Sequence, residues 1–347
     1  MFKSGLLIFL ISFSISLLLV PLAKLFAHKL DILDKPDHRK IHKHPIPIIG
    51  GLPILIAFLT ALFLFREKIS GLSPVAICFI FVVFFGLVDD FGIKVKARYK
   101  ILFHLLLSTV FIFFSGMFIE LTGLGFVDRV FTICFITFMA NSFNMLDGMD
   151  GLVSGVGSIA IIFFSILFVT NPSQGMTLFL LSMAILGAIL GFLKYNFNPA
   201  TIFLGESGST LIGYCMAFLS IYAFHIIQLD ASLNIYFLSN FAKVLIPLVI
   251  LGIPIFDTYF VFINRFLNKI KFSQPGKDHS HHRISLMGFS QKETVLTLYF
   301  VQIILGSIAI LLSRADIYQF FIIFTVLSMF VFWFVSFLLR VKVYTEK

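Results

Sequence analysis

Two adjacent carboxylates, Asp89 and Asp90, follow an apolar run and precede four basic residues, the last of which is Lys100. Neighbouring carboxylates do not both ionise cheaply unless a cation lies beside them. The pair therefore predicts either a divalent-metal site or a proton-accepting role. A charged helix end at a water boundary is the alternative, and the chemical interpretation is favoured over it.

A second cluster places four polar residues at a spacing of three: Asn141, Asn144, Asp147 and Asp150. Asn141 and Asn144 share one helix face. Amide and carboxylate oxygens suit Mg²⁺, and the amides can also donate to a sugar or a phosphate. A helix-ending turn uses the same residue types, but it does not need four of them at regular spacing after an apolar helix. Chemistry is therefore favoured here as well.

A third cluster spans residues 203–209 and reads Phe-Leu-Gly-Glu-Ser-Gly-Ser. A glycine-flanked loop that leads into a helix presents free N–H groups to phosphate. Glu206 could bind a metal and Phe203 could stack on a base. A plain N-terminal helix cap is the alternative, because Ser-Gly-Ser is common there.

The fourth cluster is His279-Ser-His281-His282-Arg283, in a long basic segment. A solvated loop and a zinc site are two alternatives, but zinc prefers three or four rigidly held ligands and no cysteine is nearby. Imidazoles beside an arginine fit diphosphate contacts better.

A basic run, Arg39-Lys40-Ile-His42, precedes the sequence Pro45-Ile-Pro47-Ile-Ile-Gly50-Gly51. Its cations could contact lipid headgroups or a substrate, and both interpretations remain open. Asp257, inside a later apolar stretch, completes the set of candidate residues.

The amino-acid composition indicates which class of protein carries these clusters. Of the 347 residues, 59% are hydrophobic and 12% are charged, against about 25% charged in soluble proteins. This excludes soluble domains, disordered chains, secreted disulfide scaffolds and free nucleic-acid binders. The sequence predicts an all-α, polytopic integral membrane protein with about eleven transmembrane helices. The apolar stretches run over 5–23, 48–65, 73–88, 101–118, 129–146, 152–170, 176–193, 208–228, 241–262, 293–313 and 317–339.

Twenty of the 26 lysines and arginines lie in five segments: 24–47, 94–100, 194, 265–292 and 340–347. The positive-inside rule places these segments in the cytoplasm, with the N-terminus outside and the C-terminus inside. The expected organisation is a single transmembrane domain over residues 1–347. Its cytoplasmic loops 24–47, 89–100, 147–151, 194–207 and 263–292 would form one face that gathers the polar clusters.

Together these motifs resemble the polyprenyl-phosphate N-acetylhexosamine-1-phosphate transferase family, glycosyltransferase family 4. The resemblance covers residues from about 31 to 292. The matching segments, in family order, are Arg39-Lys40 with Pro47-x-x-Gly50-Gly51, Asp89-Asp90 with Lys100, Asn141 to Leu152, Phe203 to Ser209, Pro254-Ile-Phe-Asp257-Thr, and the histidine loop.

The resemblance implies transfer of a sugar-1-phosphate from a UDP-sugar to undecaprenyl phosphate, with release of UMP. It implies dependence on Mg²⁺, or on Mn²⁺, and a role in assembling cell-envelope polysaccharide. The active site would face the cytoplasm from the inner membrane, and a homodimer is one expectation. The His-x-His-His-Arg loop is similar to that of the GlcNAc branch, so UDP-GlcNAc is the expected donor. Phospho-N-acetylmuramoyl-pentapeptide transferase is the alternative.

The resemblance also implies residue roles. One residue departs from the family pattern: Glu206 stands where the family has an aspartate, and its longer side chain could shift the metal, because Mg²⁺ tolerates little distortion. The expected catalytic residues are Asp89, Asp90, Asp147, His281 and His282; the metal ligands are Asp147 and Glu206; the substrate-binding residues are Lys40, Lys100, Asn141, Asn144, Asp150, Phe203, His279 and Arg283.

Two other function classes remain as alternatives. Transporters also carry acids within membranes, but here the acids crowd one face and no internal repeat is visible. Aromatic prenyltransferases and CDP-alcohol phosphotransferases use paired aspartates, but neither accounts for the histidine loop together with the Phe203 segment. Within the favoured class, the hypothesis is a single in-line displacement at the β-phosphorus of the UDP-sugar. A two-step route through an aspartyl-phosphate stays open, since carboxylates can act as nucleophiles.

Overall fold

The protein was studied as a computed structural model, which describes residues 2–36, 44–66, 73–233, 235–271, 276–341 and 343. These residues are mostly helical, with one two-stranded sheet, which confirms the predicted all-α class. The helices are α1 (Phe2–Lys29), α2 (Gly51–Leu64), α3 (Ser73–Asp90), α4 (Ala97–Ser115), α5 (Gly125–Leu146), α6 (Leu152–Val169), α7 (Pro172–Asn196), α8 (Gly205–Ile226), α9 (Tyr236–Ile250), α10 (Gly252–Leu267), α11 (Ser280–Leu286), α12 (Gln291–Leu312) and α13 (Ile317–Leu339).

Within the described ranges, nine helices are long and apolar enough to cross a membrane, which confirms a polytopic membrane protein. Two of the eleven predicted stretches are not among these nine, although the bent pair of α9 and α10 counts as a tenth candidate if it forms one span. Helix α2 is apolar but has only 14 residues. The predicted span 241–262 is two helices, α9 and α10, that meet at an angle of 88°.

Two prolines explain the break between α9 and α10. Pro247 lies inside α9 and Pro254 lies in the first turn of α10. Proline provides no N–H for a helix interior but is tolerated in a first turn. The chain therefore ends one helix at Ile250 and starts another at Gly252.

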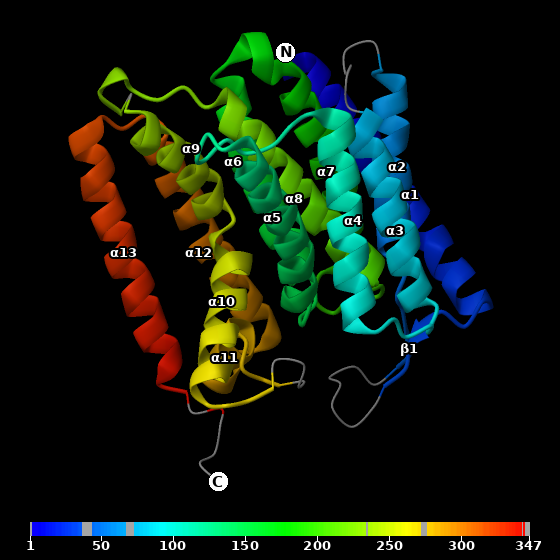
Figure 1. The fold of residues 1–347 in the computed structure, drawn as a ribbon. Helices are drawn as coiled ribbons and strands as arrows, with labels where there is room; N and C mark the ends of the chain where they lie inside the picture. The colour runs from blue at the N-terminus through cyan, green and yellow to red at the C-terminus, as the bar shows by residue number, and fades with distance from the viewer. Residues whose placement is uncertain are drawn as a thin grey trace.

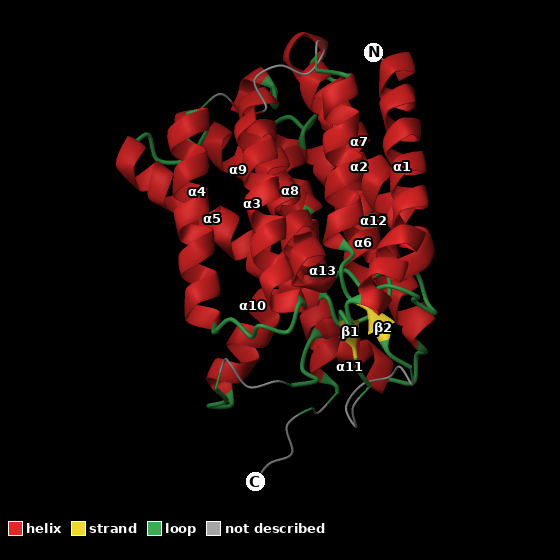
Figure 2. Cartoon of the chain, turned by 90° about the vertical axis from the view of Figure 1, so that its right-hand side faces the viewer, coloured by secondary structure: helices red, strands yellow, loops and turns green. Residues whose placement is uncertain are grey.

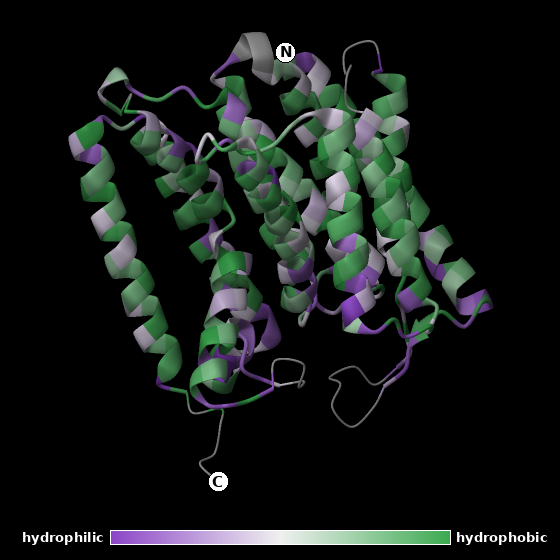
Figure 3. Ribbon diagram, in the orientation of Figure 1, coloured by the Kyte–Doolittle hydropathy of each residue, from purple (hydrophilic) through white to green (hydrophobic). Residues whose placement is uncertain are grey.

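The chain ends lie at opposite ends of the helix bundle (Figure 1), as an odd number of crossings requires. The end that carries the C-terminus also carries α11 and the small sheet, as the turned view shows (Figure 2). This sheet pairs β1 (Leu33–Asp34) with β2 (Ile46–Pro47) in antiparallel fashion. Hydrophilic residues gather at this end of α4 and around α11 (Figure 3).

Helix α8 forms the centre of the bundle, and almost all of its residues are buried. Small residues let its neighbours approach closely. A Cβ added at Gly86 on α3 would overlap the backbone of Ser207, and one added at Gly213 on α8 would lie 2.7 Å from Ala140 Cα on α5. Helices α3 and α5 therefore both deliver their ends to the start of α8, where the polar clusters meet.

Candidate active site at the ends of α3, α5 and α8

One lysine joins two of the predicted acidic clusters. Lys100 Nζ lies 2.9 Å from Glu206 Oε2 and 3.0 Å from Asp89 Oδ2. The side chains of Lys100, Asp89 and Glu206 are 18%, 26% and 9% exposed, so Asp89 is the most accessible of the three. The ammonium thus bridges two acids that come from different helices, α3 and α8.

Asn144 supports the same carboxylate from α5. Its Nδ2 donates to Glu206 Oε2 at 2.9 Å, and its Oδ1 lies 2.9 Å from the Ser209 hydroxyl. Because an ionised carboxylate only accepts hydrogen bonds, Asn144 must turn its NH₂ group toward Glu206 and its oxygen toward Ser209. Ser209 thus orients Asn144, a function that sequence analysis missed.

Asp90 has a different task from its neighbour Asp89. Its carboxylate accepts the backbone N–H of Glu206 at 2.7 Å and that of Ser207 at 3.1 Å. Gly205 has φ +71°, and a Cβ there would lie 2.6 Å from Asp90 Oδ1. Asp90 therefore caps α8 from another helix. Contrary to the sequence prediction, these two N–H groups are not free for phosphate.

Asp147 follows α5 directly and is half-buried. None of the described residues donates a hydrogen bond to its carboxylate. Burial, and then the negative charges of Asp90, Asp150 and Glu206, raise its pKa to about 7. A carboxylate among like charges and without a donor favours a bound cation. This oxygen donor set fits Mg²⁺, with Asp147 and Glu206 as the residues that would hold it.

Asp150 and Asn141 make internal contacts. Asp150 Oδ2 accepts hydrogen bonds from Asn198 Nδ2 and from the Ala200 N–H, both at 3.0 Å. Asn141 Nδ2 donates to the Thr137 carbonyl one turn earlier in α5. Asp150 thus holds the loop between α7 and α8, and the predicted substrate contacts of both residues stay predictions.

Phe203 joins the third cluster to the proline–glycine segment. Its N–H donates to the Pro47 carbonyl at 2.8 Å, and its carbonyl accepts the Gly50 N–H at 3.0 Å. A Cβ at Gly51 would lie 2.6 Å from the Ser207 carbonyl carbon. The two predicted motifs are therefore adjacent, whereas stacking of Phe203 on a base stays a prediction. Lys40, with Arg39 and His42, lies outside the described residues.

Asp257 organises the histidine loop from α10. Its Oδ2 lies 2.7 Å from His279 Nδ1, and its Oδ1 accepts the Ser280 N–H and the Ser280 hydroxyl, both at 2.6 Å. Burial lowers the pKa of His279, but the hydrogen bond and the negative charge of Asp257 outweigh this, so the net pKa is raised. His279 is thus paired with a buried acid, a contact that the sequence did not indicate.

His281 connects the histidine loop to the carboxylate clusters. It is 1% exposed, and neither ring nitrogen has a hydrogen-bond partner among the described residues. Burial lowers its pKa to about 3. A Cβ added at Gly148 would overlap His281 Nε2, so the imidazole lies against the residue after Asp147. The ring of His282 lies beside it, with 4.3 Å between centroids.

Arg283 is 3% exposed, and its guanidinium donates hydrogen bonds to backbone carbonyls of other segments. It donates to the Leu338 and Val341 carbonyls, at 3.2 and 2.6 Å, and to the Asp278 carbonyl at 3.1 Å. It thereby fastens the histidine loop to the end of α13. Its predicted contact with a diphosphate stays a prediction.

Comparison with known proteins identifies the family of this chain. Residues 72–224 match the model of glycosyl transferase family 4. A probable undecaprenyl-phosphate N-acetylglucosaminyl 1-phosphate transferase from Bacillus subtilis (strain 168) is 33% identical over 329 residues, which cover 91% of this chain and 87% of the relative. The chain belongs to glycosyl transferase family 4.

Two further relatives of this chain are named for different transferase activities. A decaprenyl-phosphate N-acetylglucosaminephosphotransferase from Mycobacterium leprae (strain TN) is 28% identical, over 80% of this chain and 76% of its own. A phospho-N-acetylmuramoyl-pentapeptide-transferase from Bacillus anthracis (strain A0248) is also 28% identical, over 89% of this chain and 98% of its own. The family alone therefore leaves the donor open.

Proposed function

We propose that this protein transfers GlcNAc-1-phosphate from UDP-GlcNAc to undecaprenyl phosphate and releases UMP. The observation that carries the proposal is the meeting of Asp89, Lys100, Asn144, Asp147 and Glu206, from four segments of the chain, at one end of the helix bundle. Similarity to the Bacillus subtilis relative and the His-x-His-His-Arg loop favour GlcNAc over the muramoyl-pentapeptide donor.

We place this end of the bundle at the cytoplasmic face of the inner membrane. The basic segments 94–100 and 265–292 flank the site, and basic loops favour the cytoplasm. A water-soluble nucleotide sugar and a membrane lipid can meet only at such a surface. The site residues lie at helix ends and in loops, within reach of both.

In the proposed reaction, an oxygen of the lipid phosphate attacks the β-phosphorus of the UDP-sugar. The bond from that phosphorus to the bridging oxygen breaks, and UMP leaves. Mg²⁺, or Mn²⁺, held by Asp147 and Glu206 would supply neutralisation of the diphosphate charge. Lys100 holds Asp89 and Glu206 in place and adds positive charge where phosphate oxygens gather.

Asp89 is the better of the two adjacent acids for accepting a proton from the lipid phosphate or for positioning it. Both oxygens of Asp90 already accept backbone hydrogen bonds from α8. Asp89 is 26% exposed, and its contacts are Lys100 and the Val95 N–H. Asp90 is then a positioning residue that fixes Glu206 through the start of α8.

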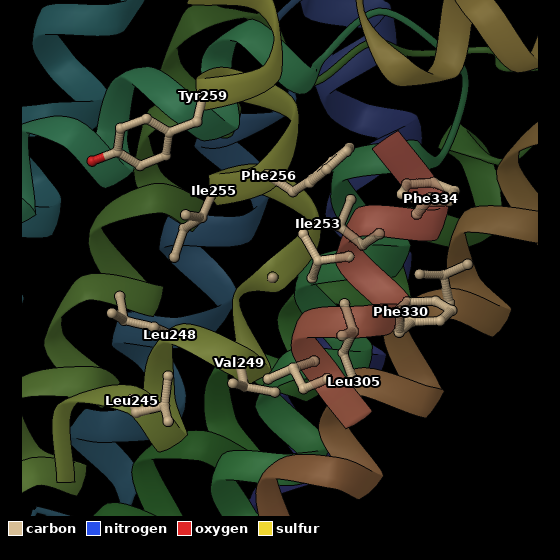
Figure 4. A pocket seen from close by; sticks show the side chains of 14 residues that line it. Leu245, Leu248, Val249, Ile253, Ile255, Phe256, Tyr259, Leu305, Phe330 and Phe334 are labelled. Atoms are coloured by element: carbon tan, nitrogen blue, oxygen red, sulfur yellow. The ribbon is translucent and has the colours of Figure 1, made fainter. Parts of the chain in front are cut away.

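The lipid chain of the acceptor has a suitable place beside α10. A cavity of about 310 Å³ lies at the break between α9 and α10 and faces α12 and α13 (Figure 4). Its labelled side chains are apolar apart from Tyr259, and they include Ile253, Phe256, Leu305 and Phe334. Phe256 directly precedes Asp257, which holds His279. Isoprene units in this cavity would leave the phosphate near the histidine loop.

The test is release of UMP by the purified protein in lipid nanodiscs that contain undecaprenyl phosphate. UDP-GlcNAc and UDP-MurNAc-pentapeptide are supplied separately, each with Mg²⁺ and with excess EDTA. The proposal predicts UMP with UDP-GlcNAc, only when Mg²⁺ and the lipid phosphate are present. If UMP is released from UDP-MurNAc-pentapeptide but not from UDP-GlcNAc, the donor assignment is reversed. If no UMP is released from either donor, the result favours a transporter.

The same preparation distinguishes the one-step route from the two-step route. In the absence of lipid acceptor, an enzyme that works by a single displacement accumulates no phosphorylated protein. A stable acyl-phosphate on an aspartate, detected by mass spectrometry after incubation with UDP-GlcNAc, would establish the two-step route instead.

A further inference from the structure

Asp257, His279 and His281 form a second cluster of ligating groups. One carboxylate oxygen and one nitrogen of each imidazole lie within 4.8 Å of one another. Asp257 comes from α10, whereas the histidines come from the start of α11, more than twenty positions later in the chain. Asp257 and His281 are each 1% exposed. The cluster is thus buried and assembled from two separate segments, unlike a group of acids on the protein surface.

His281 points to a missing ligand in this cluster. Both of its ring nitrogens are buried without a hydrogen-bond partner in the part of the chain that the structure describes. Burying a polar group without a partner costs free energy, and native proteins do so rarely. A bound cation would satisfy one of these nitrogens.

The surroundings of Asp257 are those of a pre-oriented ligand. The Ser280 N–H and hydroxyl both donate to Asp257 Oδ1, and this leaves Oδ2 directed at His279. Hydrogen bonds from outside the coordination sphere commonly orient metal-binding carboxylates and imidazoles in this way. Without a metal, a proton shared between Asp257 and His279 occupies the same position.

We propose that Asp257, His279 and His281 bind one borderline divalent transition metal ion, such as Zn²⁺. Two imidazoles and one carboxylate are a ligand set that zinc sites use, and they leave a fourth position open. Mg²⁺ prefers an all-oxygen environment, so this site is chemically distinct from the one formed by Asp147 and Glu206. The metal would connect α10 to the histidine loop, beside Gly148.

The test uses Co²⁺ as a spectroscopic probe on the full-length protein, stripped of metal with a chelator and kept in nanodiscs. Wild type is expected to bind one Co²⁺ per chain with a visible d–d absorption band. Asp257→Asn and His281→Gln are expected to bind it at least about tenfold more weakly. His225→Gln removes a histidine whose ring contacts the Phe118 carbonyl on another part of the protein, and Glu206→Gln removes a proposed Mg²⁺ ligand. Both should bind Co²⁺ like wild type.

A second measurement on wild type alone covers the case in which the variants do not fold. X-ray absorption of the Zn²⁺-loaded protein is expected to show two imidazole ligands with oxygen in the remaining positions. An all-oxygen shell, no Co²⁺ bound at one equivalent, or unchanged binding in folded His281→Gln would each overturn the proposal. Because no turnover is needed, these results are independent of the proposed transferase activity.

Discussion

Lys100 on α4 donates to Glu206 on α8 across 2.9 Å, and Asn144 on α5 donates to the same oxygen at the same distance. Two neighbouring helices, α4 and α5, thus fix one oxygen of this carboxylate, while no described residue donates to the other. The free oxygen is available to a metal ion. The longer side chain of this glutamate is thus held in place at one oxygen.

Replacing Glu206 tests this arrangement. Glu206→Gln removes the charge and leaves Lys100 with Asp89 as its acidic partner, so we expect turnover to fall by at least about 100-fold, as for loss of a strong electrostatic contact. Glu206→Asp is the matched control that keeps the charge, and it should retain most of the activity. UMP release at several Mg²⁺ concentrations measures both variants. Equal activity in Glu206→Gln and wild type would remove Glu206 from the site.

Gly148 is expected to be needed for the contact between the two halves of the site. In Gly148→Ala, the added methyl group overlaps His281 Nε2, so the imidazole must move away from Asp147. We expect at least about a tenfold loss in kcat, because displacements of about 1 Å have large effects on catalysis. Gly125→Ala is the control, since the nearest atom to its Cβ is the end of the Arg129 side chain at 3.9 Å. A fully active Gly148→Ala enzyme would contradict the predicted role of His281.

Substitution of Asp90 is expected to lower stability, whereas substitution of the adjacent Asp89 is expected to lower turnover. Asp90→Asn leaves one N–H at the start of α8 facing an amide NH₂, which should lower the free energy of unfolding by about 1–3 kcal/mol. Asp89→Asn should reduce turnover with a smaller change in stability. Thermal unfolding and UMP release, measured on both variants, separate the two effects. The assignment is wrong if Asp89→Asn proves the less stable of the two.

A buried ion pair is expected to hold the loop that carries the histidines. Arg265 makes two bonds to Asp278, at 2.6 and 2.8 Å, and both side chains are almost fully buried. Asp278→Asn should destabilise the protein by about 3–5 kcal/mol, because it leaves a buried charge without its partner. Lys35→Ala breaks the exposed pair with Asp31 and should change stability by less than about 1 kcal/mol. The unfolding midpoints of Asp278→Asn and Lys35→Ala are measured in detergent. A similar loss of stability in both variants would contradict the predicted role of the buried ion pair.

Features that depend on a local sequence pattern, such as the apolar helices and the polar clusters, could be predicted from the sequence. Apolar length placed ten of the eleven expected stretches on single helices. The regular spacing of polar residues pointed to Asn144 and Asp147, whereas the glycine-flanked loop pointed to Glu206. The break at Leu251 was missed because the region 241–262 is apolar on both sides of it, although Pro247 and Pro254 are a usable signal.

Contacts between distant segments could not be predicted. Asp90 caps a helix that begins 115 residues later, and Asp257 pairs with a histidine 22 residues further along the chain. Neither contact leaves a periodic pattern, because tertiary packing alone brings the partners together. The same holds for the hydrogen bonds of the buried Arg283 guanidinium to carbonyls at the end of α13, whereas its predicted phosphate contact stays a prediction.

The most direct test of the proposed function follows each phosphorus atom of the donor. UDP-GlcNAc labelled with ³²P at either the α- or the β-phosphorus is incubated with the protein, Mg²⁺ and undecaprenyl phosphate, and lipid and water phases are separated. Transfer of GlcNAc-1-phosphate predicts β-label in the lipid and α-label in UMP, with neither movement in Asp147→Asn. If both labels stay in water as UDP while GlcNAc enters the lipid, only the sugar is transferred and the central claim is wrong.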